Sequence, residues 1–224
     1  MTRLKPHPEI LTEAQQAIWP EMKDMPDDFV LYGGTALALR LGHRISVDFD
    51  FFSNRGFTPD ELERQIPFLK RAERIQSKTD TLVCLVDRGG FVKASFFGGL
   101  NMRRVADPDR VKGPGFFVAS LLDAAATKIK VVQDRAEAKD YQDIAAILKA
   151  GLDLPAVLSA AKAVYGEPFN PFLSLKALSY FGDGDLSTLS DPIQSFLISE
   201  VRKVDIKKIP EISFLPGGLT PVGT

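Results

Sequence analysis

Residues 44–51, in a predicted strand that runs to Phe52, alternate strictly between polar and apolar side chains, and no other feature constrains the fold of this chain as much. Successive side chains of a β-strand point to opposite faces of a sheet, so the alternation predicts a strand with one polar face and one apolar face. The polar face carries Asp48 and Asp50. The apolar face is predicted to lie in the core and consists of Val47, Phe49 and Phe51.

The other strand signals also lie before residue 120. Residues 29–32 form a short apolar run stopped by two glycines, and residues 81–87 and 91–97 flank a turn sequence, which predicts a hairpin. A weaker strand signal lies within residues 111–119. Helical patterns cover residues 11–25, 36–41 and 58–69, and then most of the chain from about 120 to about 204. The sequence therefore predicts an α+β fold in which a mixed sheet is followed by a helical C-terminal half.

Composition removes several kinds of chemistry. The 224 residues include one cysteine, Cys84, and two histidines, His7 and His43. An internal disulfide is excluded, and a zinc site built from these side chains is not expected. Cys84 lies in an apolar strand and is predicted to be buried and inert. Any reaction must depend on carboxylates, cations, hydroxyls and backbone groups.

The charges nearly balance, since 28 Lys and Arg face 29 Asp and Glu, for a net charge of −1. No overall positive field attracts nucleic acid, so RNA would have to be held locally. Two basic clusters, residues 70–74 and 202–208, are the candidates for such a contact. The chain has neither a signal-peptide pattern nor an apolar run of the ~20 residues that a membrane span needs, which predicts a cytoplasmic protein without a membrane partner.

Two short motifs stand at the start of the alternating segment. Gly33, Gly34 and Thr35 follow the short strand at 29–32 and open a helix, where backbone N–H groups and the helix dipole favour a phosphate. Thirteen residues after Thr35, Asp48 and Asp50 offer two carboxylates on one strand face, and hard oxygen ligands suit Mg²⁺ or Mn²⁺. An isolated Asp-x-Asp would be a solvated strand face. Combined with the Gly-Gly-Thr turn, it predicts a metal-bound nucleoside triphosphate (NTP).

A second group of charged residues lies in the helical half. If residues 128–139 form one helix, Lys128, Arg135 and Lys139 share a face and can neutralise a triphosphate. Asp143 lies four residues beyond Lys139 and is positioned to orient that lysine. The alternative is a solvated helix face with ordinary charge pairs.

The stretch from Gly33 to Phe52 resembles the first motif of the AbiEii/AbiGii toxin family of nucleotidyltransferases, which belongs to the polymerase-beta-like nucleotidyltransferase superfamily. Lys128, Arg135 and a basic-Asp-x-x-Asp at 139–143 resemble a second family motif. The segment 175–181, followed by Asp183 and Asp185, resembles the C-terminal part of the family, so that the resemblance covers about residues 28–200.

The resemblance implies a catalytic domain at 1–118, a helical domain at 119–210 that completes the nucleotide site, and a flexible tail at 211–224. It implies transfer of a nucleoside monophosphate from an NTP to an acceptor hydroxyl, with tRNA or another RNA as acceptor and an antitoxin as protein partner. Asp48, Asp50 and Lys128 are then catalytic, and the two aspartates hold Mg²⁺ or Mn²⁺. The nucleotide-binding residues are Gly33, Gly34, Thr35, Arg44, Ser46, Lys128, Arg135, Lys139 and Asp143.

One position departs from the superfamily pattern. A third metal-binding acid is expected on the strand at 91–97, where the chain has Lys-Ala-Ser with Ser95 at the expected place. Two alternatives therefore stay open. The chain could bind nucleotide without turnover and act through protein interaction, or it could transfer the nucleotide to a small molecule, which the near-neutral charge favours.

Overall fold

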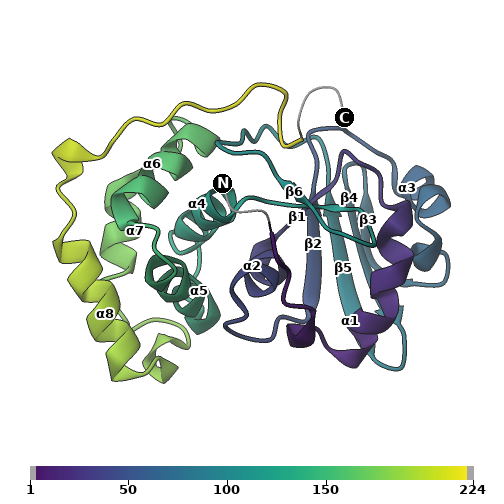
Figure 1. Cartoon of the computed structure of the whole chain (residues 1–224), viewed down its shortest axis with the longest axis horizontal. Coiled ribbons are helices and arrows are strands. Elements are labelled where there is room, and N and C mark those ends of the chain that lie inside the picture. Colours follow the sequence, from purple (N-terminus) through teal and green to yellow (C-terminus); the bar gives the residue numbers. More distant parts are fainter. Residues whose placement is uncertain (1–3, 221–224) are drawn as a thin grey trace. The chain divides into compact units, whose positions relative to one another are not determined.

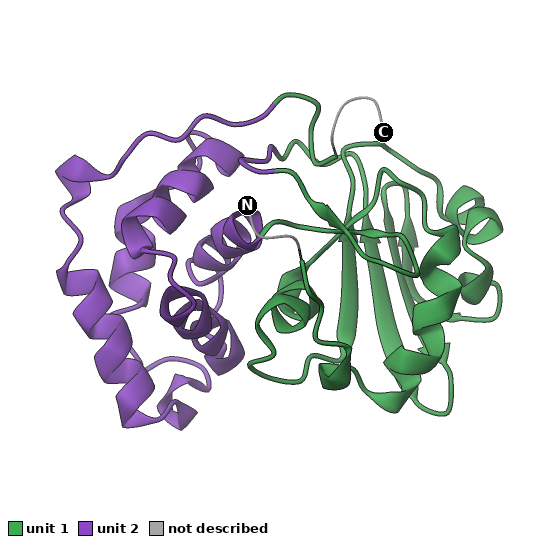
Figure 2. Ribbon diagram, in the orientation of Figure 1, with its two compact units in different colours: residues 1–102, 107–120, 216–224 green, residues 103–106, 121–215 purple. Residues whose placement is uncertain are grey.

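The computed structural model describes residues 4–220, which divide into two compact units (Figure 2). Within the described residues, the first unit comprises 4–102, 107–120 and 216–220, and the second comprises 103–106 and 121–215. The first unit contains all the strands, whereas the second is built from helices (Figure 1). The predicted fold class, a mixed sheet followed by a helical half, is confirmed.

A seven-stranded mixed sheet forms the first unit, in the order β3-β4-β5-β2-β1-β7-β6. Its strands are β1 (Val30–Tyr32), β2 (Asp48–Phe52), β3 (Glu73–Lys78), β4 (Thr81–Asp87), β5 (Phe91–Phe97), β6 (Asp109–Arg110) and β7 (Phe117–Val118). β2 lies at the centre, antiparallel to β1 and parallel to β5. The predicted hairpin is confirmed as β4 and β5, which pair along their whole length.

The helical segments of the first unit pack on this sheet. They are η1 (Pro8–Ile10), α1 (Glu13–Ile18), η2 (Trp19–Asp24), α2 (Gly33–Leu41), α3 (Pro59–Gln65) and η3 (Pro67–Leu69). Figure 1 shows α1 and α3 beside the strands. The predicted helix at 11–25 becomes α1 and then the 3₁₀ segment η2, because Pro20 cannot donate the hydrogen bond that an α-helix needs there.

The core lies against the apolar face of the sheet. Phe49, Phe51, Phe96 and Cys84 are completely buried there, as the alternating pattern predicts for the phenylalanines of β2. Cys84 is buried as predicted, and this burial raises the pKa of its thiol to about 11.

The strand β2 is shorter than the alternation predicts. It begins at Asp48, and residues 44–47 form part of the loop after α2. Ile45 and Val47 are therefore 64% and 53% exposed, and the prediction that Val47 lies in the core is wrong. The reason is that a period of two reports alternate faces only where a neighbouring strand pairs, and β5 pairs with β2 from Asp48 onward.

The second unit contains five α-helices among the described residues. They are α4 (Leu121–Val131), α5 (Ala138–Lys149), α6 (Leu154–Tyr165), α7 (Pro171–Ala177) and α8 (Asp191–Arg202), with 3₁₀ turns η4 (Leu186–Thr188) and η5 (Ile206–Lys208). α4 packs on α5 and α6, and α8 packs on α5. In residues 4–220 no single helix is long and apolar enough to cross a membrane, and the sharply bent pair α5–α6 alone meets that test by length and composition.

In the segment predicted to be a flexible tail, most of residues 211–217 are exposed, whereas the N–H groups of Leu215 and Leu219 bond to other parts of the chain. Leu215 pairs with Arg104 of the second unit through an N–H···O bond of 2.7 Å. Residues 216–220 return to the first unit, where Leu219 is buried and its N–H donates to the Asn54 side chain at 2.5 Å. Residues 221–224 of that prediction lie outside the described part.

Candidate active site

β1 ends at Tyr32 and leads directly into the first turn of α2 at Gly33. Gly33 has φ +71, a left-handed backbone conformation that favours glycine, and the preceding Tyr32 makes no capping hydrogen bond through its side chain. A Cβ on Gly33 would lie 2.7 Å from Oδ2 of Asp50. The glycine therefore lets the start of the helix touch the Asp50 carboxylate, which joins the two motifs in one place.

Two predicted side chains lie over Gly34. A Cβ on Gly34 would lie 2.6 Å from Nη2 of Arg44 and 2.8 Å from Oγ of Ser46. A guanidinium, a hydroxyl and the N–H groups of the first turn thus converge at the positive end of α2. Positive groups gathered at a helix N-terminus favour an anion, so this arrangement can bind a phosphate.

The hydroxyl of Thr35 makes contacts within the protein. Its side chain is buried, and its hydroxyl contacts the backbone oxygen of Asp48 and, at 3.0 Å, the hydroxyl of Ser46. The threonine therefore ties α2 to the start of β2. These contacts position Ser46 and Asp48.

The polar face of β2 meets the polar face of β5. Because the two strands are parallel, Asp48 lies opposite Lys93 and Asp50 lies opposite Ser95. Lys93 Nζ is 2.9 Å from Oδ2 of Asp48, whereas Ser95 is buried. We refer to Asp48, Asp50, Lys93 and Ser95 as the sheet-face cluster.

This cluster fits a divalent metal ion only in part. Asp48 and Asp50 are half-buried and supply hard carboxylate oxygens, and Mg²⁺ is commonly held by one or two carboxylates together with water and phosphate oxygens. No group of three or more His, Cys, Asp or Glu side chains within residues 4–220 has the geometry of a metal site. The two aspartates can hold a metal that a nucleotide also ligates, with Ser95 in place of a third acid.

The spacing predicted that Lys128, Arg135 and Lys139 lie on one helix. In the structure they do not. Lys128 belongs to α4, which ends at Val131, and Lys139 belongs to α5, which starts at Ala138. Arg135 lies in the turn between them. The single-helix prediction is wrong because this turn brings α5 back to α4 and closes contacts that a straight helix could not make.

Those contacts form a buried cluster of Lys128, Asp140 and Asp143. Nζ of Lys128 lies 2.6 Å from Asp140 and 2.9 Å from Asp143, and all three side chains are almost fully buried. Asp143 therefore pairs with Lys128, whereas the spacing predicted Lys139 as its partner. Lys139 is exposed and pairs with Glu137 at 2.7 Å.

Arg135 extends the buried cluster toward solvent. Its Nε donates to Asp140 at 2.7 Å while its side chain is 45% exposed. Burial opposes ionisation of Asp140, but the hydrogen bond from Arg135 and the charge of Lys128 outweigh it, so the pKa of Asp140 lies below its usual value. Asp140 thus stays ionised at neutral pH and holds both cations.

Arg135 also lines an open pocket of about 380 Å³ within the second unit. Lys176 and Tyr180 of the α7 region line it as well, together with Asp183. The pocket therefore combines cations with an exposed aromatic ring.

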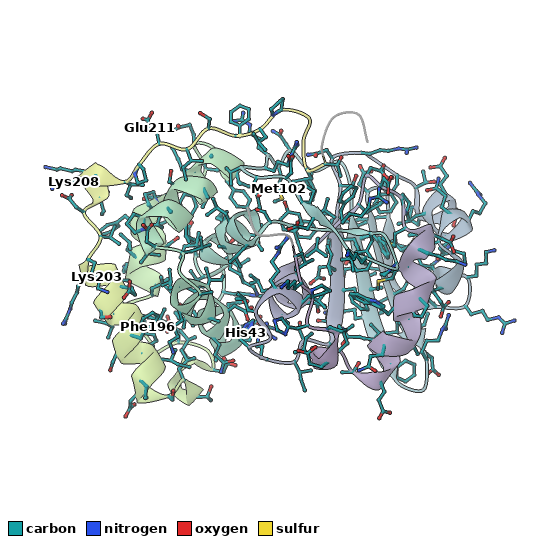
Figure 3. The ribbon with its side chains drawn as sticks, viewed as in Figure 1. His43, Met102, Phe196, Lys203, Lys208 and Glu211 are labelled. Carbon is teal, nitrogen blue, oxygen red and sulfur yellow. The ribbon has the colours of Figure 1, made fainter. Side chains whose placement is uncertain are left out.

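The two basic clusters offer less free charge than their sequences suggest. Arg74 pairs with Glu63 at 2.6 Å and with Asp60 at 2.7 Å. Lys203 pairs with Glu200 at 2.5 Å and Lys208 with Asp205 at 3.4 Å, although both side chains extend into solvent (Figure 3). Acidic side chains within or near each cluster thus neutralise part of its positive charge.

Sequence reasoning missed two participants. Lys93 had no assigned role, although its side chain touches Asp48. Asp140 was absent from the predicted site, although it is central to the buried cluster. The expected place of Ser95 on the polar strand face could have drawn attention to Lys93, because residues two apart on a strand share a face.

Solved structures with a similar fold are nucleotidyltransferases. MenT4, a nucleotidyltransferase toxin from Mycobacterium tuberculosis, superposes with a TM-score of 0.60 and 15% identity, over 86% of this chain and 83% of that one. A candidate nucleotidyltransferase from H. pylori superposes with a TM-score of 0.55 and 18% identity, over 84% of this chain and 90% of the other. At these identities the likeness concerns the fold, and it defines a nucleotidyltransferase-like fold.

The family follows from sequence. Residues 23–211 match the profile of the nucleotidyl transferase AbiEii toxin family of type IV toxin–antitoxin systems. An uncharacterised protein of Aquifex aeolicus (strain VF5) is 31% identical over 186 residues, which cover 79% of this chain and 88% of that protein. The chain belongs to the AbiEii family of nucleotidyltransferase toxins.

Proposed function

We propose that this protein transfers a nucleoside monophosphate from an NTP to an acceptor hydroxyl and releases pyrophosphate. The observation that carries the proposal is the contact between two kinds of site. The Gly33–Gly34 turn, with Arg44 and Ser46 above it, suits phosphates, and it touches Asp50, whose neighbour Asp48 completes a pair of carboxylates. An anion site in contact with a cation site is what a metal-bound triphosphate requires.

In this proposal each predicted site residue of the first unit has a defined role. The N–H groups of the first turn, Arg44 and Ser46 hold the triphosphate, and Gly33 and Gly34 leave the space that it needs. Thr35 keeps Ser46 and Asp48 in place. Asp48 and Asp50 hold Mg²⁺ or Mn²⁺, which would neutralise phosphate charge and orient the reacting groups.

The reaction itself is an in-line displacement. The acceptor oxygen forms a bond to the α-phosphorus while the bond from that phosphorus to the bridging oxygen breaks, and the hydroxyl proton passes to solvent. Pyrophosphate leaves with the electron pair of the broken bond. No residue has to form a covalent intermediate.

In the second unit, the exposed cations are the groups that can meet phosphate. Arg135 and Lys139 are about half-exposed and can contact phosphate, whereas Lys128 already pairs with two carboxylates. We therefore assign Lys128, with Asp143, the task of fixing the turn that presents Arg135.

The acceptor and partner follow from the family rather than from a contact in this chain. We propose tRNA or another RNA as acceptor and a cognate antitoxin as protein partner, with the reaction in the cytoplasm, where NTPs and RNA are found. The near-neutral charge of the chain means that RNA would be held locally. A small-molecule acceptor is the competing possibility.

Incubation with each labelled NTP and total tRNA tests the proposal. The double variant Asp48→Asn with Asp50→Asn is expected to abolish incorporation and to relieve any growth arrest on expression, because neutral amides cannot replace the carboxylates. Gly34→Ala is expected to weaken NTP binding, because its methyl group enters the space beside Arg44 and Ser46. Unchanged incorporation in the double variant would refute the metal assignment, and a panel of small hydroxyl compounds tests the competing acceptor.

A second candidate function rests on Ser95. A neutral, buried serine lies opposite Asp50, where the superfamily pattern predicts an acid. A protein that binds NTP and acts by interaction alone would show NTP and Mg²⁺ binding by calorimetry and no labelled product with any acceptor.

A further inference from the structure

Lys93 shares the polar face of the sheet with the two aspartates. It lies opposite Asp48 across the parallel β2–β5 pair, and its ammonium is 2.9 Å from the Asp48 carboxylate. Neighbours along its own strand, Val92 and Ala94, point into the core and are buried. The position of Lys93 is therefore fixed by strand register, and its side chain cannot turn to the other face.

The charges of the sheet-face cluster bear on how many metal ions it can hold. Asp48 and Asp50 contribute two negative charges, Lys93 one positive charge and Ser95 none, which leaves one negative charge. Two divalent ions about 3.5–4 Å apart are normally clamped by several shared carboxylates. Here Ser95 supplies no carboxylate for a second ion, because a neutral hydroxyl lies opposite Asp50 where a third acid would stand.

The ammonium of Lys93 can itself act as the second cation. A lysine is a compact point charge with three donors on a flexible stem, and it is a common ligand of phosphate oxygens. The Lys93 side chain is 41% exposed and that of Asp48 is 33% exposed, so an incoming ligand can reach both. A metal that binds Asp48 takes over the carboxylate that Lys93 contacts, which removes the attraction that holds the ammonium at Asp48.

We propose that the sheet-face cluster takes a single divalent metal ion, and that Lys93 supplies the positive charge of a second one by moving from Asp48 to the triphosphate. This inference rests on the proposed function, because it assumes that a nucleotide binds beside Asp48 and Asp50. It gives Lys93 opposite effects on two ligands. The lysine competes with the metal for Asp48, and it helps to hold the nucleotide.

Titration with Mn²⁺, followed by electron paramagnetic resonance, tests the metal half in the absence of nucleotide. The unmodified protein is expected to bind one Mn²⁺, and Lys93→Met is expected to bind it about tenfold more tightly because a competing charge is gone. Lys93→Gln is measured as well, so that a folding defect in one variant leaves the other. Lys78→Met, on the exposed edge strand β3 of the same sheet, is the matched control and should bind Mn²⁺ unchanged.

A non-hydrolysable NTP analogue tests the nucleotide half. With the analogue and Mn²⁺ present, the unmodified protein should still bind a single Mn²⁺, and Lys93→Met should bind the analogue about tenfold more weakly. A lysine with a purely structural role would not strengthen one ligand and weaken the other. Ser95→Asp, which adds the third carboxylate, is expected to allow a second Mn²⁺.

Three outcomes would overturn the inference: two Mn²⁺ ions in the unmodified protein, an Mn²⁺ affinity unchanged in both Lys93 variants, or an analogue affinity unchanged in both. These outcomes are separate from the fate of the proposed function. If no acceptor is ever labelled while the Mn²⁺ titrations behave as expected, transfer fails and the assignment of Lys93 stands. If labelled product forms but two Mn²⁺ bind, transfer stands and the assignment of Lys93 fails.

Discussion

The sheet-face cluster and the buried cluster contain the same chemical groups in opposite surroundings. In the first, Lys93 contacts Asp48 at 2.9 Å with both side chains partly exposed. In the second, Lys128 contacts Asp140 and Asp143 at 2.6 and 2.9 Å with all three side chains removed from solvent. Exposed ion pairs contribute about 0–1 kcal/mol, whereas loss of one partner from a buried set costs several kcal/mol. The sheet-face cluster can therefore exchange partners with a ligand, and the buried cluster cannot.

The largest effect is expected from removal of the buried cation. Lys128→Met removes the buried cation that lies between Asp140 and Asp143 and leaves the Asp140 carboxylate with Arg135, and it should lower the free energy of unfolding by about 3–5 kcal/mol. Urea denaturation followed by circular dichroism measures this loss. Lys130→Met, on the same helix, breaks only the Lys130–Asp134 surface pair and should cost no more than about 0.5 kcal/mol. Equal losses of stability in Lys128→Met and Lys130→Met would show that the buried ion pairs contribute no more than a surface pair.

Acid is expected to weaken the buried cluster next. The pKa of Asp140 in the folded protein lies below its value in the unfolded chain, so the stabilisation that it provides is present above about pH 4 and is lost as pH falls through the folded pKa. The free energy of unfolding should thus fall as pH is lowered from about 5 to about 3. Asp140→Asn should be less stable than the unmodified protein at neutral pH, and the gap should narrow in acid. A gap that stays constant over this range would contradict the assigned role of Asp140.

The smallest effect on stability is expected at the sheet-face cluster. Asp48→Asn removes a partly exposed charge, and it should change the free energy of unfolding by no more than about 1 kcal/mol. The same substitution should nevertheless weaken Mn²⁺ binding, because one of two carboxylate ligands is lost. Denaturation and Mn²⁺ titration of one preparation measure the free energy of unfolding and the Mn²⁺ affinity of the same variant. A stability loss as large as that of Lys128→Met would show that Asp48 is structural.

Local sequence pattern predicted the sheet core and the first motif well. The phenylalanines of β2 are buried and the aspartates lie on the opposite face, because β2 is paired on both sides and its period of two is enforced. The hairpin of β4 and β5 was equally predictable, since two apolar runs flank an Arg-Gly-Gly turn. The edge strand β3 was not predicted, because all six of its residues are exposed and only Ile75 among them is apolar.

Tertiary contacts decided what the sequence could not. The turn between α4 and α5 contains no proline or glycine to signal it, and the contacts of Lys128 with Asp140 and Asp143 become visible only once the chain has folded back. Ile45 and Val47 continue the alternation of β2, but no strand pairs with them. The contact of Lys93 with Asp48 depends on the register of two strands more than 40 residues apart, which no local pattern contains.

The return of residues 216–220 to the first unit has a consequence for the order in which the protein is made. The N–H of Leu219 bonds to Asn54, 165 residues earlier, in the loop that follows β2. Since chains fold as they leave the ribosome, the unit that carries Asp48 and Asp50 acquires this segment only after residues 121–215 of the second unit have been synthesised. A nascent chain that has passed residue 120 thus has its strands and its aspartates, yet it still lacks the residue that bonds to the Asn54 side chain.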